Sequence, residues 1–341
     1  GAWEGPSAHT TPDPITLHSV LAQAAAAGVT HAAMEASSHG LDQRRMDGVR
    51  IKAAGFSNFT QDHLDFHGSM ENYFAAKALL FTPEFSKQAI ICTDDEWGIK
   101  LAGQVKIPVI TIGANGAWKT SQPNSSANGI TTQLIEIQNS DSISLSVNML
   151  GSYNATNAAC ALAASQILGL PIAASLESLK NVRSIPGRLE KVTIDSPGTA
   201  IVDYAHTPDA VATVLTVIKD ANPNRVITVI GCGGDRDSLK RPLMGKVAAQ
   251  LSDVVIVTDD NPRSEDPAAI RKSVVDGTKD GSAQVFEVSD RREAISQALK
   301  LAEPGDVIAV LGKGHETGQE ISGKVFPFDD RVVVREESKN V

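Results

Sequence analysis

Two polar clusters near the start of the chain combine carboxylate, hydroxyl and imidazole side chains. Glu35 and Ser37 follow an apolar run at residues 29–34, and His63 follows a second apolar run at residues 51–56. The carboxyl ends of parallel strands meet at one edge of a sheet, so we expect these side chains to line one pocket. A carboxylate and an imidazole there would suit Mg²⁺ handled together with phosphate. Judged alone, the plainer alternative is favoured, in which Glu35 caps a turn and His63 hydrogen-bonds within its own loop.

Lys77 lies on an apolar helical stripe with Phe74, Ala78 and Phe81. A lysine in that setting ordinarily extends its amine to water. The more specific interpretation is a desolvated amine that reacts with carbon dioxide to form a carbamate. Such a carbamate would place a negatively charged metal ligand where a cation stood.

Three polar loops in the second half of the chain each follow an apolar run. They carry Arg236 in a glycine-rich turn, Arg263 in the string DNPR, and Glu316 in the string GKGHE. The glycine-rich turn has the order of neither a dinucleotide fingerprint nor a P-loop. Arginine forks bind carboxylates bidentately and a glutamate receives an ammonium group, so together the loops predict a site for a substrate with more than one carboxylate. Each loop taken alone is explained equally well as a turn whose charges face solvent.

Helical and strand patterns alternate along the chain, which predicts an α/β protein with parallel sheets. In the first part we expect helices at 15–27, 69–81, 96–103, 153–168 and 171–182, strands at 29–34, 51–56, 89–93 and 109–112, and two antiparallel strands within 130–150. Pro186 and Gly187 mark a turn between two patterned regions. Beyond it we expect a doubly wound domain with strands at 189–194, 200–203, 225–231, 253–258, 284–288 and 307–311, and helices at 208–220, 242–251, 267–279 and 291–301. The predicted domains are residues 1–187 and 188–341.

Composition narrows the class of protein. The chain has 341 residues, a net charge of −9 and 4% aromatic residues, without a basic stripe. Binding to nucleic acid needs clustered Lys and Arg, so it is not expected. The three cysteines are far apart in the sequence, which indicates neither a disulfide framework nor a metal site but a reduced, cytoplasmic protein. No apolar run approaches the length of a membrane span. We also expect a monomer whose partners are small-molecule substrates.

A series of strings, in order along nearly the whole chain, resembles the Mur ligase family. Within the family it resembles the group that adds the third amino acid to UDP-MurNAc-L-Ala-D-Glu. The strings are TTPDP (10–14), MEASSHGLDQRR (34–45), NFTQDHLDFHG (58–68), YFAAKALLF (73–81), GSYNATNAACALAA (151–164), PGRLE (186–190), VDYAHTPDA (202–210), GCGGDRDSLKRPLMG (231–245), DNPRSEDP (260–267) and GKGHETGQ (312–319). The resemblance implies a three-domain ligase with a central ATPase-type domain and a Rossmann-like C-terminal domain. ATP would phosphorylate the glutamate carboxylate, and an incoming amine would displace the phosphate to form an amide.

The resemblance also implies a role for each matched residue. Contacts with the UDP-MurNAc-dipeptide would be made by Thr10, Thr11, Ser37, Gln43 and Arg45. The catalytic magnesium site would contain Glu35, His63 and Lys77, the last as its carbamate. ATP would be bound by Asn154, Asn157, Arg188, Asp203 and His206. The incoming amino acid would be bound by Arg236, Asp260, Asn261, Pro262, Arg263, Gly312 and Glu316.

The DNPR string is associated in this family with meso-diaminopimelate rather than L-lysine. Diaminopimelate carries an extra carboxylate and ammonium at its far end, where Arg263 and Glu316 would pair with them. Lysine would leave Arg263 unpaired, which is unfavourable in a closed site. Two alternatives stay open: an L-lysine-adding ligase of the same family, and a non-catalytic protein that binds the muropeptide or amino acid. The metal and carbamate set argues against the second.

One departure from the family concerns the phosphates. The printed sequence contains neither the N-terminal uridine-binding domain nor the glycine-rich phosphate loop that precedes Thr10 in the family. That loop supplies backbone N–H groups and a lysine to the triphosphate. We therefore expect a partial ligase sequence that is inactive as written.

Overall fold

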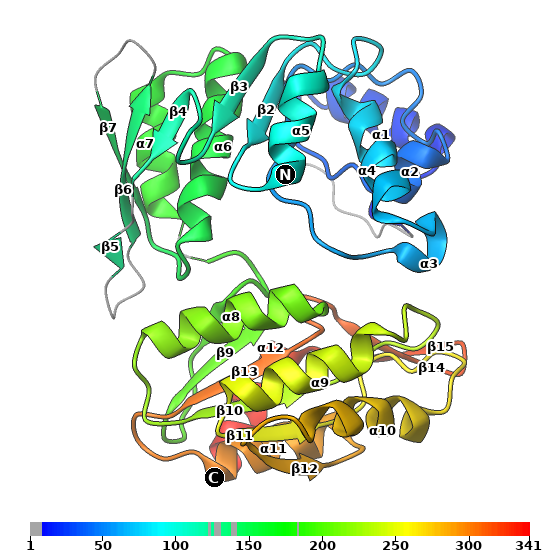
Figure 1. Ribbon diagram of the computed structural model, residues 1–341, viewed down its shortest axis with the longest axis vertical. Coiled ribbons are helices and arrows are strands. Elements are labelled where there is room, and N and C mark those ends of the chain that lie inside the picture. Colours follow the sequence, from blue (N-terminus) through cyan, green and yellow to red (C-terminus); the bar gives the residue numbers. More distant parts are fainter. Residues whose placement is uncertain (1–8, 122–123, 126–130, 138–141, 183) are drawn as a thin grey trace.

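Helices and strands alternate along the chain and build two lobes, each around its own sheet (Figure 1). The computed structural model describes residues 9–121, 124–125, 131–137, 142–182 and 184–341. The first lobe is residues 9–182 and the second lobe is residues 184–341. The predicted α/β class is confirmed, with a mixed sheet in the first lobe and a mainly parallel sheet in the second.

The first lobe contains a sheet in the order β1-β2-β3-β4-β6-β5, with β7 also paired to β6. β1 (Ala54–Phe56), β2 (Ala89–Cys92), β3 (Val109–Ile112) and β4 (Trp118–Thr120) run parallel. β5 (Asn124–Ser125), β6 (Thr131–Ile137) and β7 (Ser142–Val147) add antiparallel pairs. The alternating pattern within 130–150 therefore predicted its antiparallel strands correctly.

The helices of the first lobe begin largely where capping residues place them. They are α1 (Pro14–Ala26), α2 (Ser38–Asp42), α3 (Leu64–His67), α4 (Met70–Ala78), α5 (Glu96–Gln104), α6 (Tyr153–Ile167) and α7 (Ile172–Asn181), with a 3₁₀ turn η1 (Leu79–Phe81). The side chains of Asp13, Ser69 and Asp95 each accept a backbone hydrogen bond at the start of a helix. The alanine-rich face of α6 packs on one side of the sheet, against Ile90 and Ile112.

The predicted strand at residues 29–34 is wrong. This segment has no regular secondary structure and no strand partner among the described residues, and it is exposed, with Val29 48% and Met34 39% accessible. A strand is stabilised by its ladder of hydrogen bonds to a neighbour, and the described sheet ends at β1 on this side. An apolar run without a neighbouring strand therefore stays irregular.

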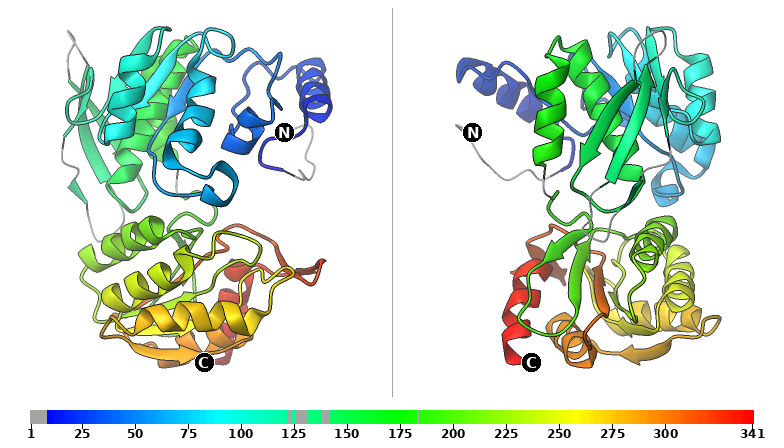
Figure 2. Two further views of the ribbon diagram at one scale, coloured as in Figure 1. Left: turned by 45° about the vertical axis from the view of Figure 1, so that its right-hand side comes forward. Right: turned by 90° about the vertical axis from the view of Figure 1, so that its left-hand side faces the viewer.

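The second lobe contains a doubly wound sheet in the order β12-β11-β10-β13-β9-β8. Its strands are β8 (Glu190–Val192), β9 (Thr199–Asp203), β10 (Val226–Ile230), β11 (Val254–Val257), β12 (Gln284–Glu287) and β13 (Val307–Leu311), all parallel except β8. On one face lie α8 (Pro208–Asp220), α9 (Lys240–Leu251) and α10 (Pro267–Thr278). On the other lie α11 (Arg291–Leu301) and α12 (Asp330–Glu337), followed by a 3₁₀ turn η2 (Ser338–Asn340). Figure 2 shows these two layers on opposite sides of the sheet.

Two elements of the second lobe were not predicted from the sequence. One is α12, and the other is a hairpin of β14 (Gly318–Ile321) and β15 (Lys324–Pro327). The hairpin extends beyond the main sheet beside the carboxyl ends of the strands (Figure 1). Among the helices that the structure describes, none is both long and apolar enough to cross a membrane.

Candidate functional site

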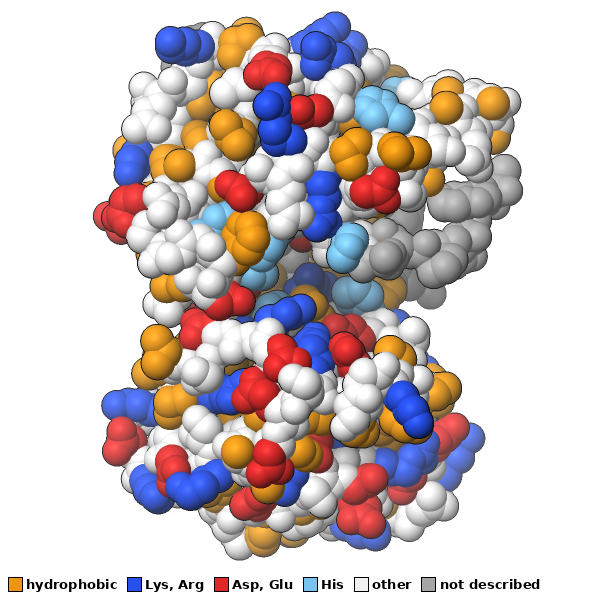
Figure 3. All heavy atoms as spheres, turned by 90° about the vertical axis from the view of Figure 1, so that its right-hand side faces the viewer, with side chains coloured by type: hydrophobic (Ala, Val, Ile, Leu, Met, Phe, Trp, Pro, Cys, Tyr) orange, Lys and Arg blue, Asp and Glu red, His pale blue; other side chains and the backbone are white. Residues whose placement is uncertain are grey.

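A cavity of about 980 Å³ lies between the two lobes. Four of the five residues predicted to bind ATP line it: Asn154, Asn157, Arg188 and Asp203. The asparagines lie near the start of α6, and Asp203 ends β9, so both lobes direct polar groups into the same space. Figure 3 shows that histidine side chains gather along the groove between the lobes.

The Asp203 carboxylate fixes the turn that carries Arg188. It accepts hydrogen bonds from the backbone N–H groups of Leu189 and Ala205, both at 2.7 Å. Burial raises the pKa of Asp203, although these hydrogen bonds act in the opposite direction. The Arg188 guanidinium lies over the Tyr204 ring, 4.8 Å from its centroid. A cation held on an aromatic face beside a polar cavity is suited to an anionic ligand such as a nucleotide phosphate.

The fifth residue predicted to bind ATP, His206, instead faces Asp62 of the first lobe. Its Nε2 atom lies 3.7 Å from Asp62 Oδ2, and His63 Nε2 lies 3.6 Å from the same oxygen. Burial acts to raise the pKa of Asp62, but the hydrogen bond from His206 and the charges of His63 and Lys240 outweigh it and hold the pKa below the usual range. Asp62 therefore joins the lobes as a carboxylate between two imidazoles, a role that the sequence analysis did not assign.

Lys77 is half-buried on α4, with its Nζ atom 5.3 Å from the centroid of the Tyr73 ring. Burial lowers the pKa of the Lys77 amine, while the charges of Glu35 and Asp62 act to raise it. Burial also lowers the pKa of His63, and Lys77 contributes in the same direction. The charge of Glu35 thus acts on Lys77 and the charge of Lys77 acts on His63, although Glu35 itself is exposed.

The same residues offer few ligands for a cation. Within the described part of the chain, no three His, Cys, Asp or Glu side chains lie close enough to hold a metal ion by themselves. Glu35 and His63 offer only two donors, and a carbamate on Lys77 would supply a third. This sparse, mainly oxygen set fits Mg²⁺, which keeps several water ligands and shares substrate phosphates.

The residues predicted to contact the UDP-MurNAc-dipeptide surround Thr11, whose side chain is fully buried. Its hydroxyl donates to the Glu35 carbonyl at 3.0 Å and accepts from the Ser37 N–H at 2.9 Å, and its own carbonyl accepts from Arg45 at 3.0 Å. Arg45 also donates to Gln43. Thr11 thus fixes the segment around Glu35, while Thr10 is exposed beside it. Their predicted contacts with substrate stay predictions.

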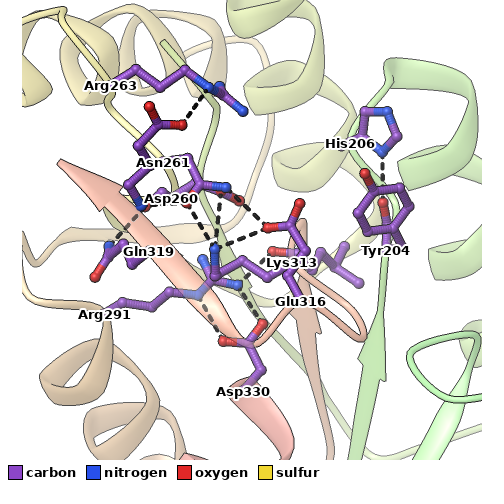
Figure 4. A network of polar contacts seen from close by, with 12 residues as sticks. Tyr204, His206, Asp260, Asn261, Arg263, Arg291, Lys313, Glu316, Gln319 and Asp330 are labelled. Carbon is purple, nitrogen blue, oxygen red and sulfur yellow. Dashed lines mark hydrogen bonds and ion pairs between the residues drawn. The ribbon is translucent and has the colours of Figure 1, made fainter. Parts of the chain in front are cut away.

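The loops of the second lobe form one polar network around a buried lysine (Figure 4). Lys313 is 0% exposed, and its amine donates to Asn261 Oδ1 and to Glu316 Oε2, both at 3.0 Å. The Asn261 amide donates to the same Glu316 oxygen at 2.9 Å, and Asp260 Oδ1 lies 3.8 Å from the lysine amine. Three predicted residues are therefore brought together by Lys313, which lies in the GKGHE string but was not among the predicted site residues.

A second buried ion pair supports this network from below. Arg291 makes a bidentate pair with Asp330, at 2.8 Å for each contact, and both side chains are 0% exposed. Arg291 also donates to the carbonyl of Leu311, the residue before Gly312. Gly312 has φ +115°, and a Cβ there would lie 2.5 Å from Asp260 Oδ2. Only glycine fits this close approach.

Arg263 differs from the expectation in one respect. Its guanidinium already forms an ion pair with Glu320 of β14, at 3.2 Å from Nε to Oε2, and it donates from Nη1 to the Gly234 carbonyl at 2.8 Å. The argument that lysine would leave Arg263 unpaired is therefore wrong, because Glu320 pairs with it when no ligand carboxylate is present. The hairpin was not predicted, so this partner was missed.

Arg236 does not join the network in this structure. Its side chain is exposed and donates to the carbonyl of its neighbour Asp235 at 2.9 Å. Its charge acts to lower the pKa of His39 in the first lobe, although burial of His39 is the larger cause. Pro262 is buried within the loop between Asn261 and Arg263.

Comparisons with known proteins agree with this arrangement. Residues 1–165 match the Mur ligase middle domain, and residues 187–314 match the Mur ligase glutamate ligase domain. The chain is 46% identical over 333 residues to UDP-N-acetylmuramoyl-L-alanyl-D-glutamate–2,6-diaminopimelate ligase from Agrobacterium fabrum, covering 96% of this chain and 67% of the relative. It is 41% identical to the ligase of that name from Corynebacterium glutamicum, covering 97% of this chain and 66% of the relative.

Solved structures show the same fold. A structure of a UDP-N-acetylmuramoyl-L-alanyl-D-glutamate–2,6-diaminopimelate ligase matches with a TM-score of 0.62 and 37% identity, over 97% of this chain and 69% of that chain. A UDP-N-acetylmuramate–alanine ligase from Thermotoga maritima matches with a TM-score of 0.61 at 20% identity, over 85% of this chain and 58% of that chain, which supports the fold alone. The chain belongs to the Mur ligase family.

Proposed function

We propose that this protein is an ATP-dependent amide ligase that adds meso-diaminopimelate to UDP-MurNAc-L-Ala-D-Glu during peptidoglycan precursor synthesis. The observation that carries the proposal is that the amino-acid loops join in one polar network, in which Asn261, two residues before Arg263, donates to Glu316. The network thus contains both a guanidinium and a carboxylate. The far end of diaminopimelate carries a carboxylate and an ammonium and so complements both. The relatives that share more than 40% identity carry this activity in their names.

In the proposed reaction, the interlobe cavity holds ATP with its phosphates toward the first lobe. Asn154, Asn157 and Arg188 bind the nucleotide, and the Asp203 turn keeps Arg188 in place. The terminal phosphoryl group passes to the glutamate carboxylate of the dipeptide, which gives an acyl-phosphate and ADP. The amine of diaminopimelate then attacks the acyl carbon, phosphate leaves, and the amine loses a proton as the amide forms.

Glu35, His63 and the carbamate of Lys77 would hold Mg²⁺, which neutralises phosphate charge when it is bound. The lowered pKa of Lys77 supports the modification, because only the neutral amine reacts with carbon dioxide. Asp62 holds His63 and His206 together and so fixes the first lobe against the second where the phosphoryl group is transferred. Thr10, Thr11, Ser37, Gln43 and Arg45 would orient the UDP-MurNAc-dipeptide.

We further propose that the protein acts as a monomer in the cytoplasm, where ATP and nucleotide-linked precursors occur. The test of the main proposal uses the full-length protein with ATP, Mg²⁺ and UDP-MurNAc-L-Ala-D-Glu. With meso-diaminopimelate we expect ADP release and a product whose mass increases by one diaminopimelate residue. A product formed with L-lysine and none with diaminopimelate would refute the substrate assignment. Binding of both substrates without ADP release would favour the non-catalytic alternative.

A further inference from the structure

Arg263 is held in an uncommon backbone conformation by the β14–β15 hairpin. Its φ is +52°, a region that is unfavourable for residues other than glycine unless surrounding contacts impose it. The Arg263 N–H donates to the Glu320 carbonyl at 3.1 Å, and the Ser322 N–H donates to the Arg263 carbonyl at 2.7 Å. The hairpin therefore fixes where the Arg263 side chain begins.

The same hairpin is fastened to the rest of the amino-acid loop. Gln319 Nε2 donates to the Asp260 carbonyl at 2.7 Å, and the Glu320 N–H donates to Asn261 Oδ1 at 2.9 Å. These contacts place the Glu320 carboxylate at the edge of the network, on the Nε side of Arg263 (Figure 4 shows the Arg263 guanidinium and its carboxylate partner). The Glu320 side chain is 39% exposed, so it lies at the rim of the site and not in its core.

The Arg263 guanidinium keeps one nitrogen for a ligand. Its Nε and Nη1 atoms have protein partners, whereas Nη2 makes no hydrogen bond among the described residues. The Arg263 side chain approaches the backbone of Gly233 closely, since a Cβ at Gly233 would lie 2.9 Å from Nη1. A ligand carboxylate that accepts from Nη2 would then share one guanidinium with the Glu320 carboxylate.

We propose that Glu320 is a specificity-determining residue, which acts as an internal counter-ion that competes with the distal carboxylate of the amino-acid substrate for Arg263. This inference rests on the proposed function. Two carboxylates on one guanidinium repel each other, so Glu320 weakens binding of diaminopimelate. With lysine, which lacks the distal carboxylate, Glu320 keeps Arg263 neutralised and so removes the penalty for leaving it unpaired. Both effects reduce the preference for diaminopimelate over lysine.

The competing possibility is that Glu320 mainly positions Arg263. A half-exposed ion pair contributes little to positioning, and the backbone contacts of the hairpin remain when the side-chain charge is removed. The repulsion between two carboxylates that share a partly buried guanidinium is larger than the free energy that this ion pair contributes to positioning Arg263. Removing the charge should therefore favour diaminopimelate.

The test is Glu320→Gln in the full-length protein, because glutamine keeps an oxygen that accepts from Arg263 but carries no charge. The measurement is kcat/KM for meso-diaminopimelate and for L-lysine from amino-acid-dependent ADP release. We expect the ratio of the two values to rise about tenfold, or about 1.4 kcal/mol, mainly through a lower KM for diaminopimelate. If Glu320 had a purely structural role, the substitution would change kcat/KM for both amino acids by the same factor and leave their ratio constant.

Two controls sharpen the result. Glu336 of α12 forms an ion pair with Arg292 of α11 at 2.8 Å, away from the amino-acid site. Glu336→Gln removes this carboxylate and should leave the ratio of the two kcat/KM values unchanged. In an Arg263→Gln background, Glu320→Gln should no longer raise the ratio, because the shared cation is gone. An unchanged or lowered ratio in the single variant of an active protein overturns the role of Glu320 alone. A wild-type protein that forms product with neither amino acid overturns the proposed function, and this inference with it.

Discussion

Replacing Asp330 by asparagine should destabilise the second lobe strongly. The substitution leaves the Arg291 guanidinium buried with only part of its partner, because the asparagine amide could accept one hydrogen bond where the carboxylate accepted two at 2.8 Å each. Burial acts to lower the pKa of Arg291 and the charge of Asp330 raises it above its usual value, but an arginine stays protonated in either case. The variant therefore keeps a charge in a site that is 0% exposed.

The expected loss follows from the type of pair that is broken. Removing one partner of a buried ion pair costs about 3–5 kcal/mol, and the hydrogen bond that asparagine can retain places the expectation near about 3 kcal/mol. The neighbouring residue on α11 gives a matched control. Arg292 pairs with Glu336 of the same α12 helix at 2.8 Å, but these side chains are 45% and 53% exposed. Glu336→Gln should therefore cost less than about 1 kcal/mol.

The assay is urea unfolding of the 341-residue chain, with the midpoint and slope of the second-lobe transition compared among the wild type and the variants. A loss below about 1 kcal/mol in Asp330→Asn, or an equal loss in the Glu336→Gln control, would refute the reasoning. The double variant Arg291→Met with Asp330→Leu should recover much of the loss, because the pair is replaced by apolar groups. In the described structure the Arg291 Nη1 atom is buried without a hydrogen-bond partner, which is unfavourable. Arg291→Met removes this atom, so the double variant also loses that cost.

Three further predictions concern the site itself. Exposure to ¹³CO₂ should give an NMR carbamate signal that is absent in Lys77→Arg. Burial lowers the pKa of the Lys77 amine and so favours its reactive neutral form. Because acid protonates this amine, the signal should weaken as the pH falls. Asp62→Asn should lower the unfolding free energy by about 1 kcal/mol at about pH 7. Because the folded-state pKa of Asp62 is depressed, its contribution is present above the ordinary aspartate pKa and is lost as the pH falls toward the folded value, so wild type and variant should converge in urea titrations at low pH. Gly312→Ala, where the Cβ would meet Asp260, should weaken diaminopimelate binding in calorimetry at least tenfold, whereas Gly169→Ala in the first lobe, with φ +82° and open space, should not.

Local patterns predicted the elements that have strong periodicity and clear ends. The helix predicted at residues 69–81, which carries Lys77, begins directly after Ser69. The Ser69 side chain accepts a hydrogen bond from the third residue of the helix and so satisfies a free N–H group. The buried strands of the second lobe were predicted from continuous apolar runs. The run at residues 29–34 is also apolar but has no neighbouring strand in the described sheet, and composition alone does not supply a partner.

The hairpin escaped prediction for a related reason. Residues 318–327 mix Gly, Lys, Glu and Pro, and the residues of β15 are exposed, so no alternation of apolar side chains marks it. Its stability comes partly from hydrogen bonds to Asp260, Asn261 and Arg263, which are far away in the sequence. Long-range contacts of this kind carry no local signal.

The sequence by itself determined the α/β class, the alternation of elements and the residue types offered to each site, because these follow from periodicity, capping and the strings shared with a family. Only the tertiary structure decided which charges meet. Asp62 and His206 lie in different lobes, Lys313 is buried among residues from two loops, and Glu320 reaches Arg263 from an unpredicted hairpin. The pairing of a charge depends on distance and burial, and both are set by how separate segments pack together and not by the order of residues within any one of them.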